Sequence, residues 1–166
     1  MATAENLKDA FAGESQANRK YLAFAKKAEQ DGFKQVARLF RAAAGAETIH
    51  AHAHLRVMGG IKGTLENLTE ARDGEGYEFQ TMYPKFLVES KAENNAAASK
   101  SFEFAMAAEK VHFALYQQAI DMVKAGKDLS DAAIYLCPIC GNVEIGTPPE
   151  KCPICGAPKD KFSQVK

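Results

Sequence analysis

The feature that most constrains this chain is a glutamate near the middle of each apolar stripe in its helical part. Residues 1 to about 125 are rich in Ala, Glu, Lys and Phe, and their apolar side chains recur at helical spacing. Two of the stripes carry a Glu-x-x-His pair, Glu47 with His50 and Glu109 with His112. Since residues three apart lie on one face of a helix, both side chains of each pair are expected to point into a core.

Start and stop signals divide this part into four long helices, which we expect at residues 4–30, 33–58, about 65–93 and 95–124. Thr3 is the expected N-cap of the first helix. Gly74, Gly76 and Pro84 fall inside the third helix, so a kink or irregular turn is expected there. Helices of this length joined by short links predict an antiparallel bundle.

The link between the second and third helices, Gly59 to about Thr64, is short for a crossover connection. We expect irregular first turns of the third helix to supply the missing reach. Beyond the bundle, residues 126–134 are interpreted as a linker, and residues 135–166 as a separate small module. The predicted domains are therefore 1–125, 126–134 and 135–166.

Several carboxylates on facing stripes cannot be buried together unless cations compensate their charge. Two divalent irons would do so and would use carboxylate and imidazole ligands well. The pattern is that of ferritin-like di-metal bundles, in which two helices each give one Glu and two give Glu-x-x-His. The predicted fold is therefore mainly α, a ferritin-like four-helix bundle followed by a metal-binding module. The predicted di-iron ligands are Glu14, Glu47, His50, Glu75, Glu78, Glu109 and His112.

A single Glu-x-x-His would be chance more often than a metal site, and any one glutamate could lie on a solvated face. Two such pairs, with glutamates on the other two helices, make the metal interpretation strong. His52 and His54 are expected to be packed or surface histidines rather than ligands. Tyr21, Tyr83 and Tyr116 are expected to be mainly core aromatics, with one or two bonded to ligand carboxylates.

All four cysteines fall in two Cys-x-x-Cys-Gly loops near the C-terminus: Cys137, Cys140, Cys152 and Cys155. Such loops can place four thiolates in a tetrahedron around a metal, and tight pairs do not resemble a disulfide framework. Spacing alone leaves zinc and iron open. A redox-active bundle needs an electron source, and this favours iron, which would make the module a one-electron carrier.

The composition sets limits on partners and location. Lys plus Arg equals Asp plus Glu at 21 each, which argues against nucleic acid as the main partner. No apolar run is long enough to span a bilayer, and the N-terminus has no secretory pattern. We therefore expect a cytoplasmic protein with no membrane or nucleic-acid partner.

The whole chain resembles the rubrerythrin family. The motifs that carry the resemblance are Phe11-Ala12-Gly13-Glu14-Ser15-Gln16, both Glu-x-x-His pairs, Gly74-Glu75 with Glu78, Met82-Tyr83-Pro84, and the two Cys-Pro-Ile-Cys-Gly loops. The order of bundle and rubredoxin-like module is also that of the family. The resemblance implies a peroxidase that reduces hydrogen peroxide to water in oxidative stress defence, with electrons relayed through an iron centre held by the four cysteines.

The resemblance also implies roles for individual residues. Glu47 and Glu109 would bridge the irons, and Glu14 would ligate one iron. Glu75 and His112 would ligate the other. Glu78 would be an extra carboxylate that exchanges with His50 when the irons are reduced, so these two residues are the catalytic candidates, and Glu78 is also a candidate proton relay.

For partners, the resemblance implies a rubredoxin or a flavin-containing rubredoxin reductase as electron donor. It also implies a head-to-tail homodimer, in which the cysteine iron of one subunit lies near the di-iron site of the other. Two other functions compete with this one. An iron store or ferroxidase would share the bundle but would not need the cysteine module, and a zinc-ribbon adaptor would leave the buried glutamates unexplained.

Overall fold

The computed structural model describes residues 2–166 of the chain, which form two compact units. The first unit ends at Lys62 and the second begins at Gly63. The boundaries expected above, 1–125, 126–134 and 135–166, remain a prediction. Among the described residues, no helix has the length and apolar character needed to cross a membrane.

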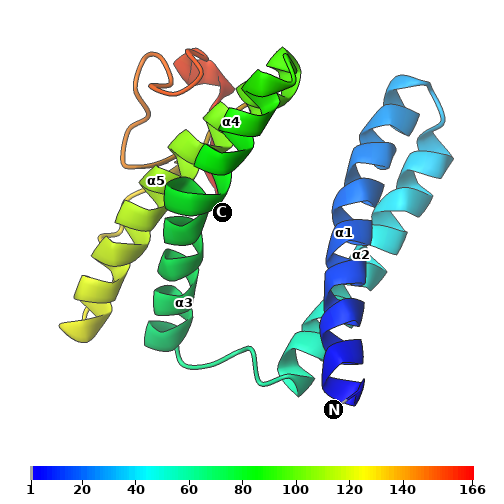
Figure 1. Cartoon of the computed structure of the whole chain (residues 1–166), viewed down its shortest axis with the longest axis horizontal. Helices are drawn as coiled ribbons and strands as arrows, with labels where there is room; N and C mark the ends of the chain where they lie inside the picture. Colours follow the sequence, from blue (N-terminus) through cyan, green and yellow to red (C-terminus); the bar gives the residue numbers. More distant parts are fainter. Residues whose placement is uncertain (1) are drawn as a thin grey trace. The chain divides into compact units, whose positions relative to one another are not determined.

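The first unit is a hairpin of two helices, α1 (Ala2–Gln30) and α2 (Lys34–Val57), which lie side by side (Figure 1). The contact uses small side chains. Ala37, Ala44 and Ala51 of α2 are buried and lie seven residues apart, so they form one seam along the helix. The predicted helices are confirmed to within two residues, but Thr3 is not an N-cap, because it lies inside α1.

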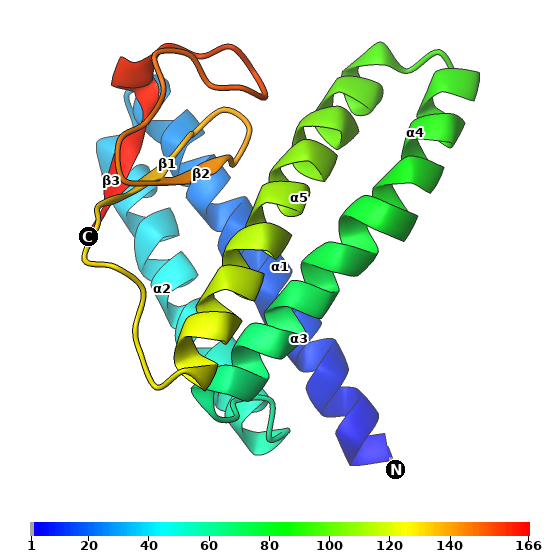
Figure 2. The ribbon, with the colours of Figure 1, turned by 90° about the vertical axis from the view of Figure 1, so that its left-hand side faces the viewer.

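The second unit begins with α3 (Thr64–Tyr77), which continues through a π-helical turn, η1 (Glu78–Met82), into α4 (Tyr83–Ala92). Next comes α5 (Ala96–Lys124), which lies antiparallel beside this long interrupted helix (Figure 2). The expected irregularity is therefore a π turn, and Pro84 is tolerated because it falls in the first turn of α4. Asn95 caps α5 by accepting a hydrogen bond from the Ala98 backbone N–H at 3.0 Å.

The expectation of irregular first turns in the third helix is wrong. The structure assigns regular α-helix to α3 from Thr64 onward. The Glu66 carboxylate reaches back to the backbone N–H of Gly63 at 3.2 Å, which fixes this helix start. The irregular segment comes fourteen residues later, at Glu78, so it adds no reach to the link before α3.

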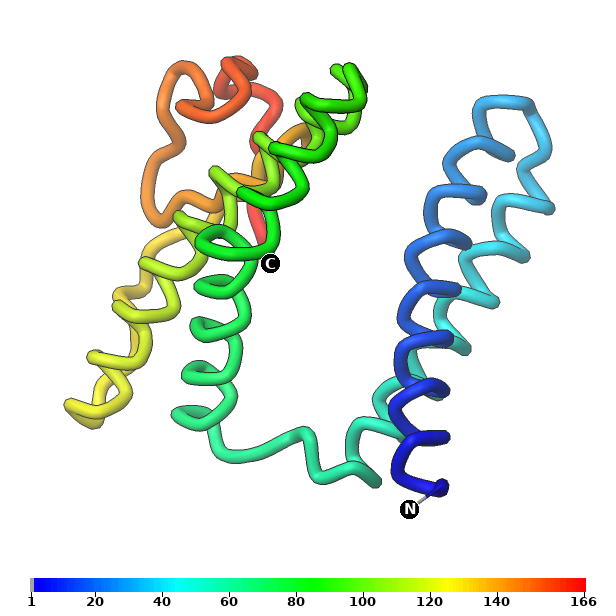
Figure 3. Tube along the Cα trace, in the orientation of Figure 1, coloured from blue at the N-terminus to red at the C-terminus, as the bar shows by residue number. Residues whose placement is uncertain are grey.

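The cysteine module contains a three-stranded antiparallel sheet with the order β2-β1-β3. Its strands are β1 (Ile134–Leu136), β2 (Val143–Ile145) and β3 (Ser163–Val165), and a short 3-10 helix, η2 (Lys159–Lys161), precedes β3. The trace in Figure 3 shows how the two cysteine loops fold back on themselves at the end of the chain. Three cysteines and Ala157 form the core of this module, and Phe104 of α5 packs against it.

Candidate metal centres

The two cysteine loops have the same backbone construction. In each loop the glycine after the second cysteine donates its N–H to the carbonyl of the first, Gly141 to Cys137 at 3.0 Å and Gly156 to Cys152 at 2.9 Å. Both glycines adopt a left-handed conformation, with φ of 83° and 76°, which side chains rarely tolerate. The repeated Cys-Gly spacing in the sequence therefore encodes two matching turns.

These turns bring the four sulfurs together. The Sγ atoms lie 3.6 Å apart for Cys137 with Cys155 and 3.5 Å apart for Cys140 with Cys152. A tetrahedral metal with bonds of about 2.3 Å to sulfur holds its sulfurs about 3.8 Å apart. The structure therefore brings together all four predicted cysteine ligands at distances that fit a single metal ion.

The sulfurs also lie in an environment that supports thiolates. Burial opposes ionisation of the Cys137 thiol, but hydrogen bonds from the backbone N–H groups of Cys140 and Ile139, together with those from the Cys155 and Cys140 thiols, lower its pKa to about 7. Burial raises the pKa of the Cys140 and Cys155 thiols. A cluster of closely spaced, mostly buried thiols needs a cation to hold all four as thiolates, because a bound metal deprotonates its thiol ligands outright.

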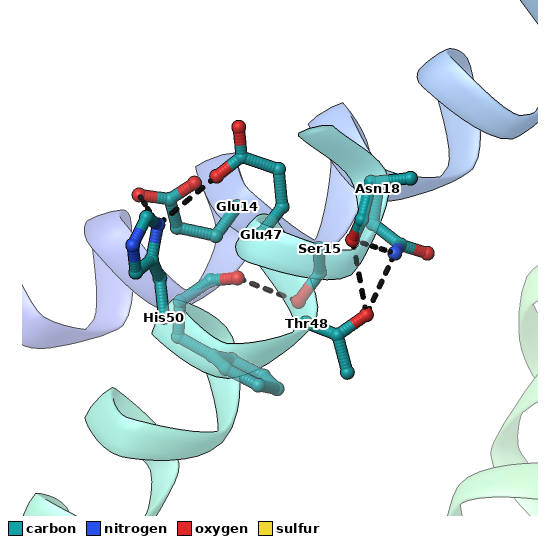
Figure 4. Close-up of polar contacts among 8 residues, drawn as sticks. Glu14, Ser15, Asn18, Glu47, Thr48 and His50 are labelled. Carbon is teal, nitrogen blue, oxygen red and sulfur yellow. Dashed lines mark hydrogen bonds and ion pairs between the residues drawn. The ribbon is translucent and has the colours of Figure 1, made fainter. Parts of the chain in front are cut away.

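The α1–α2 hairpin carries one cluster of carboxylate and imidazole ligands (Figure 4). The Nδ1 atom of His50 lies 3.1 Å from a Glu47 carboxylate oxygen and 3.8 Å from one of Glu14. Ligand atoms of all three residues lie within 4.8 Å of one another. We call these three residues the hairpin cluster.

Glu14 and Glu47 perturb each other as two carboxylates in one site should. Their shared hydrogen bond raises the pKa of Glu14, and burial adds to this effect. The same hydrogen bond lowers the pKa of Glu47, with a further contribution from His50. The pair therefore tends to hold one proton between its two carboxyls, and a bound cation would replace that proton.

A second cluster, which we call the α3–α5 cluster, is formed by Glu75, Glu109 and His112. The Nδ1 atom of His112 lies 2.7 Å from a Glu109 oxygen and 3.6 Å from one of Glu75. Burial, followed by the neighbouring Glu109, raises the pKa of Glu75 to about 7. Burial and Glu109 also raise the pKa of Glu78, which places this extra carboxyl near the same cluster.

Each cluster has an aromatic triad about two to three turns away along its helices. On the hairpin, Tyr21, Phe24 and Phe40 form the triad, with ring centroids 5.6–6.4 Å apart. Tyr21 and Phe24 follow Glu14 by seven and ten residues, and Phe40 precedes Glu47 by seven.

The second triad repeats this arrangement, but two of its rings lie one residue further along the chain from the cluster glutamate. Tyr83, Phe86 and Phe102 have ring centroids 5.6–6.2 Å apart, and Phe102 again precedes Glu109 by seven residues. Tyr83 and Phe86, however, follow Glu75 by eight and eleven residues. The extra residue is accommodated by the π turn η1, which begins at Glu78, and such turns often occur at functional sites.

One contact that the sequence did not predict connects the α3–α5 cluster to the cysteine module. The Nε2 atom of His112 lies 2.9 Å from the carbonyl oxygen of Gly141, next to Cys140. A carbonyl only accepts, so Nε2–H donates and Nδ1 is left to face the carboxylates. This contact lies within one chain, and the head-to-tail homodimer implied by the resemblance remains a prediction. No local spacing could have revealed the contact, because the partners are 29 residues apart.

Other predicted residues take the following places. The Tyr21 and Tyr83 rings lie in the two triads, and burial with the charge of Glu78 raises the pKa of Tyr83. Their hydrogen bonds to ligand carboxylates remain a prediction. Tyr116 lines an apolar cavity of about 260 Å³ between α5 and the sheet. His52 and His54 belong to none of the metal-binding clusters formed by residues 2–166.

Comparison with known proteins agrees with this geometry. The rubrerythrin family model matches residues 5–120, and the model for the rubrerythrin rubredoxin-like domain matches residues 135–163. Rubrerythrin-2 of Clostridium acetobutylicum is 37% identical over 96% of this chain and 95% of its own. Nigerythrin of Nitratidesulfovibrio vulgaris is 40% identical over 98% of this chain and 86% of its own.

Comparison with solved structures finds the same kind of relative. Nigerythrin in its fully reduced, all-ferrous state has a TM-score of 0.60 and 39% identity, with 98% of this chain and 86% of that chain covered. The ferritin-like helical bundle, the di-iron carboxylate site and the rubredoxin-like site with its four cysteines are therefore features of this chain. With both of its parts matched, the chain belongs to the rubrerythrin family.

Proposed function

We propose that this protein is a non-haem iron peroxidase that reduces hydrogen peroxide to water. Two electrons and two protons convert one peroxide to two waters. The observation that carries the proposal is the hydrogen bond from His112 to Gly141, because it joins a candidate di-iron ligand to the loop of a candidate electron carrier. An iron store would have no use for such a connection.

The bundle irons, when bound, would supply the two electrons. The four cysteines would hold an iron that passes replacement electrons from an external donor to the bundle, one at a time. Glu47 and Glu109 would bridge the two irons, since each carboxylate lies against both other members of its cluster. Glu14 is proposed to ligate one iron, while Glu75 and His112 ligate the other.

We further propose that Glu78 and His50 exchange at one iron during turnover. The two histidines differ in a way that supports this exchange. The Nε2–H group of His112 is bonded to the Gly141 carbonyl, which leaves Nδ1 2.7 Å from a Glu109 oxygen. The His50 side chain is 53% exposed, and its Nδ1 atom lies 3.1 Å from a Glu47 oxygen and 3.8 Å from a Glu14 oxygen.

Glu78 is also the proposed proton carrier. Glu78 lies in the π turn, next to the α3–α5 cluster. Both clusters have two glutamates and one histidine, and Glu78 gives the α3–α5 cluster one more carboxyl. A carboxyl that leaves the metal on reduction can take a proton and hand it to a peroxide oxygen. The proposed electron donor is a rubredoxin or a flavin-containing rubredoxin reductase, with the cytoplasm as the proposed location.

The test separates electron delivery from peroxide chemistry. A variant with Cys137→Ser and Cys140→Ser should lose turnover with a rubredoxin-type donor, because electrons no longer enter. Once its bundle has been chemically reduced, it should still consume about one peroxide per di-iron site. Full turnover by this variant would contradict the relay, and a wild-type preference for dioxygen with ferrous iron would favour a ferroxidase instead.

A further inference from the structure

The three links between the long helices set a limit on how this chain can build its bundle. Residues 31–33 and 93–95 form tight hairpin links, and residues 58–63 join the two units. Ferritin-like bundles contain one long crossover connection, which makes the helices on either side of it run parallel. In this chain the crossover could only be the link 58–63.

The link is too short for that task. If α2 and α3 run parallel with Glu47 and Glu75 at one level, then α2 ends about 15 Å beyond that level. The start of α3 then lies about 17 Å on the other side, so the link must span about 32 Å along the bundle. Fully extended, the stretch from Val57 to Thr64 reaches only about 25 Å.

Local structure shortens the reach further. Gly60 donates its N–H to the Leu55 carbonyl at 2.9 Å and Gly59 donates to Arg56 at 3.0 Å, so the link begins folded against the end of α2. At its other end, Gly63 is tied to the first turn of α3. Neither flanking helix can unwind without losing these capping bonds.

The hairpin also carries an apolar surface that needs a partner. Val36, Leu39 and Val57 are 44%, 69% and 71% exposed, and they lie at helical spacing on the side of α2 that bears Glu47 and His50. Helices with an apolar stripe on a ligand-bearing face bury it in a core. The hairpin cluster supplies three ligands, and the α3–α5 cluster supplies three of the same types.

We propose that two copies of this chain exchange their hairpins, so that each di-iron site combines ligands from both. Glu14, Glu47 and His50 of one copy would meet Glu75, Glu109 and His112 of a second copy. The dimer then has two complete sites, and short links cross between the copies instead of along one bundle. This inference rests on the di-iron site of the proposed function.

Complementation between two inactive variants tests the exchange. One variant carries Glu47→Gln with His50→Gln, and the other carries Glu109→Gln with His112→Gln, so each has lost half of every site. In a mixed dimer with exchanged hairpins, one site is doubly altered and the other is fully wild type. Random pairing of equal amounts should therefore restore about one quarter of the wild-type bundle iron.

The measurement is iron per chain after co-expression and purification of the chains, with each variant alone as control. The cysteine iron gives a constant background in all samples. Bundle iron in the mixture but in neither variant alone supports the exchange. If the wild type holds bundle iron and the mixture holds none, the exchange is wrong, although the proposed function stands.

A second measurement tests the hairpin exchange without the need for bound iron. Insertion of about ten Gly and Ser residues into the link 58–63 adds roughly 30 Å of reach, enough for a hairpin to return to its own chain. We expect the wild type to be dimeric by light scattering and the extended variant to populate monomers. A monomeric wild type would overturn the proposal.

Discussion

The α1–α2 hairpin and the α3–α5 region are two versions of one arrangement. Each has a glutamate on its first helix, Glu-x-x-His on its second and an aromatic triad at nearly the same spacing. They differ in two respects. The π turn gives the second region Glu78, and the Gly141 carbonyl fixes the imidazole of His112.

The comparison suggests that metal binding is shared while redox roles are divided. The repeated features are those needed to hold two irons. The features that distinguish the second region are an extra carboxylate and a contact with the cysteine module. Substitutions at matching positions should therefore have equal effects on metal binding and unequal effects on turnover.

The largest effects are expected from the matched bridging glutamates. Glu47→Ala and Glu109→Ala should each remove most of the bundle iron and lower peroxide turnover about a hundredfold or more, since even outer partners of ligands contribute 10–100-fold. Iron content and peroxide consumption are the measurements. Glu29→Ala and Glu103→Ala, which break exposed ion pairs on the helices α1 and α5, serve as controls. Retention of two irons by one variant alone would show that the clusters are not equivalent.

Glu78→Gln should affect turnover but not metal binding. The amide keeps the size of the side chain but cannot replace a carboxylate ligand or carry a proton. We expect near-normal iron content with turnover reduced about a hundredfold, in the range typical for a lost acid–base group. Steady-state peroxide kinetics and metal analysis would check this. Normal kinetics would mean that the π turn has a purely structural role.

A smaller effect separates the two cysteine loops. Gly141→Ala and Gly156→Ala should each destabilise the module by about 1–2 kcal/mol, because both glycines are left-handed. Only Gly141 contacts α5, where an added Cβ would lie 3.8 Å from that of Ala108. Stopped-flow reoxidation of the cysteine iron by peroxide should therefore slow about tenfold in Gly141→Ala alone. Equal reoxidation rates in both variants would show that electron transfer does not depend on the contact between His112 and Gly141.

Much of this comparison was already visible in the sequence. Helical spacing placed Glu47 with His50 and Glu109 with His112 on single faces, because side-chain direction follows from three-residue separation. The two Cys-x-x-Cys-Gly loops could be predicted for the same reason, because each turn depends on residues that are close in the sequence. The irregular turn was also expected from Gly74, Gly76 and Pro84, although its type was not.

What the sequence could not show depends on distant contacts or on hydrogen-bond choice. The contact of His112 with Gly141 depends on packing of the sheet against α5, which no local pattern encodes. The N-cap at Thr3 was wrong because helix ends vary by one or two residues. The prediction of an irregular start to α3 was wrong because Glu66 stabilises a regular first turn.

The smallest expected effect tests how the hairpin holds its cluster without an anchor like Gly141. The buried Asn18 amide donates to the Ala44 carbonyl at 2.7 Å and to the Thr48 hydroxyl at 2.8 Å, one turn from the ligands (Figure 4). Asn18→Ala should lower the free energy of unfolding by about 1–2 kcal/mol, because two buried bonds are lost. Urea denaturation of the metal-free protein measures this, with Thr48→Ala as a milder partner substitution. An unchanged midpoint would mean that the alanine seam alone sets the geometry of the hairpin cluster, and the two regions would then differ in how they are held as well as in what they do.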